Sequence, residues 1–174
     1  MRRSSIVLVG FLIATACANP TAPAGGSGPS PSIDSERLGI YEAVIRNQIE
    51  FEGEHVWIYD QICEDAEGPG TSKGPCPDAF SHDEQEALLQ ALSDVPRVEF
   101  VSDTDALTDR IFKGDATGQI VRVGPIVERE GDVEVAASHY CGGLCGGGST
   151  WLVQQADDGW KVSGPAPGHG AWIS

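Results

Sequence analysis

The sequence predicts an α+β domain in which two or three short helices pack on an antiparallel β-meander. Apolar residues recur at helical spacing in the first half of the chain, and alternating apolar and polar residues separated by tight turn signals dominate the last third. Helices early and sequential strands late are typical of α+β folds. We therefore expect the helices to cover one face of the sheet.

Three segments carry helix signals. The first begins at Asp34 or Ser35 and has its apolar stripe at Leu38, Tyr41, Val44, Ile45 and Ile49. The second opens with a capping box formed by Ser81 and Glu84 and stops at Pro96. The third starts at Ser102 or Asp103 and is closed by Gly114.

The strand signals lie on either side of these helices. The expected strands are residues 55–62, 98–102, 119–129, 132–140, 149–155 and 160–163. Residues 64–80 have the composition of a loop, and Glu130-Gly131 and Asp158-Gly159 are turn signals between strands. Residues 164–170 are expected as coil, with Trp172 docking back onto the domain.

Length and charge exclude some classes of protein. A chain of 174 residues allows one domain of ordinary size. Its net charge of −15 argues against nucleic acid or an anionic membrane surface as a partner, because like charges repel. No nucleic acid is expected to bind.

The N-terminus has the pattern of an export signal. Two arginines precede an apolar run from Ile6 to Ala16, which is too short to cross a bilayer as a helix. The small residues Ala14-Thr15-Ala16 ahead of Cys17 make this segment resemble the lipobox of bacterial lipoproteins. The resemblance implies removal of residues 1–16 and attachment of diacylglycerol to Cys17. An ordinary secretory peptide cut after Ala16 is the alternative.

A tether is expected after the signal peptide. Residues 17–32 combine the proposed lipidated cysteine with a Pro-, Gly- and Ser-rich stretch that has no large apolar side chain and no charge. Periodic apolar residues start at Ile33, so residues 33–174 are expected to form a single globular domain. The expected location is the extracytoplasmic side of a membrane, held by the N-terminal lipid.

Four cysteines remain in this domain, and an exported chain with four implies two disulfides. The sequential pairing, Cys63 with Cys76 and Cys141 with Cys145, is favoured, while the cross-pairings stay open. Two other uses of the cysteines compete. The spacing of Cys141 and Cys145 fits half of a zinc site, and thiol redox chemistry is a further alternative although no Cys-x-x-Cys is present.

A glycine-rich connection is the best candidate for a contact surface. We expect it to be a wide hairpin loop flanked by aromatic residues, because bare glycines let another backbone or ring approach closely. Its members are Tyr140, Gly142, Gly143, Gly146, Gly147, Gly148 and Trp151. The lysine and following helix of a phosphate-binding loop are absent from the sequence.

The sequence assigns no catalytic residue, no metal and no cofactor. His139 is expected in the core, His82 on a solvated helix face, and His55 and His169 have no partner nearby in the sequence. An acidic stretch has carboxylates that can bind calcium but lacks the spacing of a calcium loop. Its members are Asp60, Glu64, Asp65 and Glu67.

Three functions compete on this basis. The first is a tethered binding or interaction module of the cell envelope, whose partner is an envelope protein or ligand. The second is an envelope hydrolase that uses carboxylates and His139 as acid and base. The third is a metal or redox protein that uses the cysteines.

Overall fold

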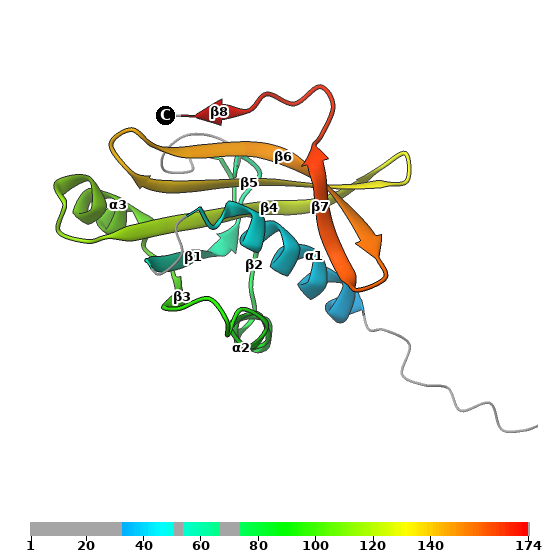
Figure 1. Cartoon of the computed structure of the whole chain (residues 1–174), viewed down its shortest axis with the longest axis horizontal. Helices are drawn as coiled ribbons and strands as arrows, with labels where there is room; N and C mark the ends of the chain where they lie inside the picture. Colours follow the sequence, from blue (N-terminus) through cyan, green and yellow to red (C-terminus); the bar gives the residue numbers. More distant parts are fainter. Residues whose placement is uncertain (1–32, 51–53, 67–73, 174) are drawn as a thin grey trace, which may run out of the picture. The chain divides into compact units, whose positions relative to one another are not determined.

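The computed structural model describes residues 33–50, 54–66 and 74–173, all of which belong to one compact unit (Figure 1). The expected signal peptide, Cys17 and tether lie outside these residues. The helices are α1 (Ile33–Gln48), α2 (His82–Ala91) and α3 (Thr104–Lys113). The strands are β1 (His55–Ile62), β2 (Asp78–Ala79), β3 (Val98–Val101), β4 (Gly118–Arg129), β5 (Asp132–Gly142), β6 (Cys145–Ala156), β7 (Gly159–Pro165) and β8 (Trp172–Ile173). The predicted α+β class is confirmed.

Local hydrogen bonds begin and end two of the helices as predicted. At α2, the backbone N–H of Glu84 donates to Ser81 Oγ at 3.3 Å and that of Ser81 donates to Glu84 Oε2 at 2.8 Å, which makes a capping box. At α3, the Asp103 carboxylate accepts from the N–H of Ala106, and Gly114 ends the helix with a left-handed φ of 75°.

The strands form one mixed sheet in the order β2-β1-β4-β5-β6-β7, with β3 beside β1 and β8 beside β6. The four strands β4 to β7 are the predicted antiparallel meander. Strand β1 adds parallel pairs with both β3 and β4. Parallel pairing needs a long crossover, and the segment from β1 to β4, which contains α2 and α3, supplies it.

The helices cover both faces of the sheet, so the expectation of one covered face is wrong. Helices α1 and α2 pack on a large apolar cluster that includes Val56, Ile58 and Val121. Helix α3 packs on a second cluster that includes Trp57 and Ile120. Successive side chains of a strand point to opposite faces, so α3 lies on the face opposite α1.

The C-terminal segment returns to the sheet. After β7, the N–H of Ala166 donates to Thr150 O at 2.8 Å, and Trp172 in β8 pairs with Gly148 of β6. The expected docking of Trp172 is therefore observed. Among the described residues, no helix has both the length and the apolarity needed to cross a bilayer.

Two disulfides join the cysteines in sequential pairs. Cys63, which is buried, is bonded to Cys76 across the segment between β1 and β2, and Cys141 is bonded to Cys145 at the β5–β6 hairpin. The pairing favoured by the sequence is the one in the structure. All four thiols are consumed, so this arrangement offers no thiolate to a metal.

Removal of the first disulfide is expected to destabilise the domain. A bridge that closes a loop of this length limits the unfolded chain and contributes about 3 kcal/mol in the loop-entropy model. Urea unfolding of the oxidised protein and of a Cys63→Ser/Cys76→Ser variant measures the difference. The Cys141–Cys145 disulfide closes a shorter loop. Its removal in a Cys141→Ser/Cys145→Ser variant should therefore lower the free energy of unfolding by less. Equal unfolding midpoints for the wild type and the first variant would contradict this account.

Candidate functional site

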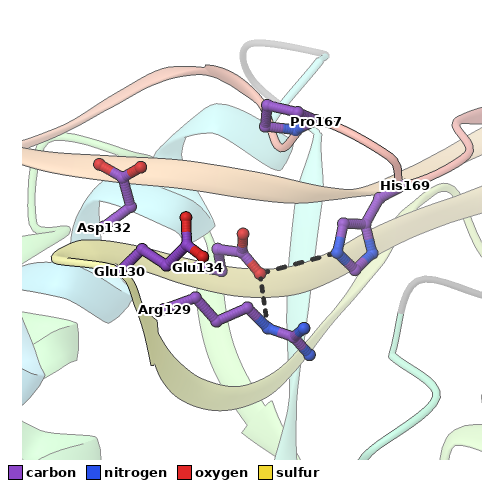
Figure 2. Close-up of a pocket in the computed structure, with 6 residues that line it drawn as sticks. All are labelled: Arg129, Glu130, Asp132, Glu134, Pro167 and His169. Atoms are coloured by element: carbon purple, nitrogen blue, oxygen red, sulfur yellow. Dashed lines mark ion pairs between the residues drawn. The ribbon is translucent and has the colours of Figure 1, made fainter.

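A pocket of about 460 Å³ lies at the β4–β5 turn (Figure 2). It is on the same face of the sheet as α3 but at the opposite end of the strands. It is lined by the end of β4, the start of β5 and the segment between β7 and β8. The lining residues are Arg129, Glu130, Asp132, Glu134, Pro167 and His169. The pocket is open to solvent and contains three carboxylates, one guanidinium and one imidazole.

Glu134 is the centre of this pocket. Its side chain is 11% exposed, and its Oε2 lies 3.2 Å from Arg129 Nε and 3.6 Å from His169 Nε2. Figure 2 shows ion-pair lines from one oxygen of the Glu134 carboxylate to both the guanidinium and the imidazole. Arg129 is itself 63% exposed. The arrangement is a nearly buried carboxylate held between one permanent cation and one imidazole that gains charge on protonation.

This arrangement can take part in proton transfer. A carboxylate next to an imidazole orients the ring, as a general base requires. The 3.6 Å separation is longer than a hydrogen bond, and such contacts often tighten only when substrate binds. The His169 side chain is 30% exposed, so a molecule in the pocket can reach it.

Sequence reasoning missed this pair. His169 lies in a Gly- and Pro-rich segment that was expected as coil, and Glu134 is one of 26 acidic residues in the chain. Their contact depends on the path of the chain after β7, which returns along β6 toward β8. No local pattern in the sequence encodes that path.

His139, the histidine named for the hydrolase hypothesis, lies on the opposite face in a buried polar cluster at the end of α1. Its Nδ1 lies 3.4 Å from Gln48 Oε1, and its Nε2 lies 3.4 Å from Glu50 Oε2. Gln119 of β4 completes the cluster: its Nε2 donates to Gln48 O and its Oε1 accepts from the N–H of Glu50. The cluster satisfies backbone groups that the end of α1 leaves open, and the expected core position of His139 is confirmed.

The glycine-rich segment is not a wide loop. Gly146, Gly147 and Gly148 are buried residues of β6, and only Gly143 and Leu144 lie between β5 and β6. The disulfide and the left-handed φ of 104° at Gly142 allow this tight turn. The sequence predicts a loop here because glycine is uncommon inside strands, and the structure shows that this prediction is wrong.

Close contacts explain why residue 147 is a glycine. A Cβ atom there would lie 3.3 Å from both His139 Cε1 and the carbonyl oxygen of Trp172, so the glycine lets β8 and the histidine ring approach β6. Tyr140 packs beside the α3 cluster and Trp151 beside the α1 cluster. These two rings therefore lie on opposite faces. A contact role for this segment stays a prediction, and its most exposed side chain is Leu144 at 92%.

The other two histidines, His55 and His82, are partly or largely exposed. His55 stacks on Trp57 and its Nε2 lies 3.0 Å from Glu99 Oε1, while His82 lies on the α2 surface 3.2 Å from Glu86. The solvated position expected for His82 is confirmed. In the described part of the chain, no group of three or more His, Cys, Asp or Glu side chains is placed to hold a metal ion.

Comparison with known proteins adds no assignment. The chain matches no protein-family model, no characterised protein and no solved structure.

His139 should make the stability of the domain depend on pH. Burial lowers the pKa of His139 below its ordinary value, although Glu50 opposes this shift. The unfolded chain then binds the proton more readily, so the contribution of His139 is complete above about pH 6.5 and is lost as pH falls through the lowered folded pKa.

Denaturant unfolding between about pH 7.5 and about pH 5 measures this dependence. In His139→Gln the loss of stability toward acid pH should be smaller than in the wild type. His82→Gln, which changes an exposed histidine, should keep the wild-type slope. A wild-type slope in the His139 variant would show that this residue does not carry the effect.

Proposed function

We propose that the chain is an exported lipoprotein, anchored through Cys17 to the extracytoplasmic side of a membrane, whose folded domain binds a component of the cell envelope. The observation that carries the proposal is the pair of disulfides, Cys63–Cys76 and Cys141–Cys145. Disulfides persist in oxidising compartments outside the cytosol. The N-terminal pattern that resembles a lipobox supports the same location.

In this proposal the lipid anchor attaches the protein to the membrane, and the folded domain binds the partner. Two or three acyl chains hold a protein on a membrane far more firmly than one. The stretch that ends near Ser32 has the composition of a tether, so the domain can reach partners away from the bilayer. The negative net charge favours stand-off from an anionic leaflet.

Lipid labelling tests the anchor. Cells that express the full chain are grown with an alkyne-bearing fatty acid, and the protein is examined for label and for membrane association. The wild type should carry label and sediment with membranes, whereas Cys17→Ser should be unlabelled and should not remain with them. An unlabelled wild type that is cut after Ala16 would replace the lipoprotein proposal with ordinary secretion.

Hydrolysis of envelope material is the second candidate function. The observation that favours it is the contact between Glu134 and His169 in a solvent-open pocket, beside Arg129. In this role the carboxylate positions the imidazole, His169 accepts a proton from an attacking water, and Arg129 attracts negative charge that develops on the substrate. His139 is buried in the polar cluster at the end of α1 and is less accessible to a substrate.

Paired substitutions test this candidate on two substrates, purified cell-wall sacculi and a mixture of peptides. If the protein releases soluble fragments, His169→Gln and Glu134→Gln should each lower the rate by roughly 100-fold or more. His82→Gln and Glu86→Gln change an exposed pair on α2 and should leave the rate unchanged. Rates that are equal in all variants, or no release by the wild type, would remove hydrolysis and leave the binding role.

A further inference from the structure

A groove lies between α1 and β7, on the face of the sheet opposite the Glu134 pocket. It consists of two depressions of about 280 and 410 Å³ that share Ala43, Arg46 and Trp160 in their walls. Each is near or within the range of volumes found for small-ligand pockets. Figure 1 shows α1 and β7 beside each other along this edge of the sheet.

The indole of Trp160 packs closely against Gly39, which lies in the middle of α1. A Cβ atom on Gly39 would lie 2.8 Å from Trp160 Cδ1, so only a glycine allows the ring to lie this close to the helix. Glycine inside a helix is less favourable than alanine. The ring packs against the edge of the main core and borders both depressions. It is therefore a fixed apolar platform in the groove.

The charged side chains that line the groove are two cations, Arg46 and Lys161, and two carboxylates, Glu42 and Asp158. Arg46 Nε is 2.9 Å from Glu42 Oε1 and its Nη2 is 2.8 Å from Asp94 Oδ1. On the β7 side, Lys161 Nζ is 2.8 Å from Asp158 Oδ2. Each cation of the groove already has a carboxylate, and Asp94 lies outside the lining, so the lining has no excess positive charge with which to select an anion.

We infer that this groove binds a neutral glycan chain. One face of a pyranose ring is apolar and matches an indole, whereas its hydroxyl groups match the donors and acceptors that surround the platform. The paired charges and the exposed amide of Asn47 supply those groups at the rim. The inference deepens the proposed function, because it depends on a location in which envelope glycans are present.

Calorimetric titration of the exported, oxidised protein tests the inference with two neutral probes, chitotetraose and cellotetraose. At least one of them should bind, and Trp160→Ala should weaken the binding by roughly 3- to 10-fold, the equivalent of one aromatic contact. Gly39→Ala should weaken it also, because the new methyl group displaces the ring. Trp172→Phe, which changes an indole outside the groove, should bind as the wild type does.

The outcomes separate the inference from alternatives. Binding of neither probe overturns it, and so does unchanged affinity in Gly39→Ala and in Trp160→Ala. If Trp160→Ala fails to fold, Asn47→Ala takes its place as an exposed rim variant that should lose affinity. Polygalacturonate, an anionic glycan, is titrated as a control. If it alone binds, the groove selects an anion and the inference is overturned. Because lipid labelling does not involve the groove, failure of the glycan titration is distinguishable from failure of the anchor.

Discussion

The burial of β1 on both of its faces is the constraint on which the rest of the domain depends. Val56 and Ile58 have no exposed surface, and Trp57, which points the opposite way, is only 6% exposed. Because both faces are apolar, the sheet must be covered twice, by α1 and α2 on one side and by α3 on the other. The same strand pairs with β2, β3 and β4. Its position therefore determines where the crossover that contains α2 and α3 can run.

The local features of this fold could be predicted from the sequence, and the long-range ones could not. Capping residues such as Ser81 and Asp103 act within one turn of a helix, and the turn at Asp158-Gly159 acts between adjacent strands, so each leaves a signal in a short window. The parallel pairing of β1 with β4 has no such signal. The glycines of β6 led to the wrong prediction of a loop. Gly147 is needed because His139 and Trp172 approach the strand closely there, and only the folded chain brings these residues together.

The candidate sites also differ in whether they depend on local or on long-range contacts. The sequence indicated the cysteines, whose pairing follows from compartment and proximity, but it gave no indication of the contact between Glu134 and His169 or of the groove at Trp160. Each of these sites joins β5 or α1 to the C-terminal third of the chain. They lie on opposite faces of the sheet.

The contact between Gly39 and Trp160 also has a consequence for when the domain can fold. Helix α1 is among the first parts of the domain to be synthesised, yet β7, against which it packs, is among the last. Contacts so far apart in the chain require closure of a long loop and form slowly. The contact of α1 with Trp160 therefore forms only after β7 has emerged, whereas its contacts with β4 and β5 involve strands that are synthesised earlier. The packing of α1 is complete only when the last third of the chain is present.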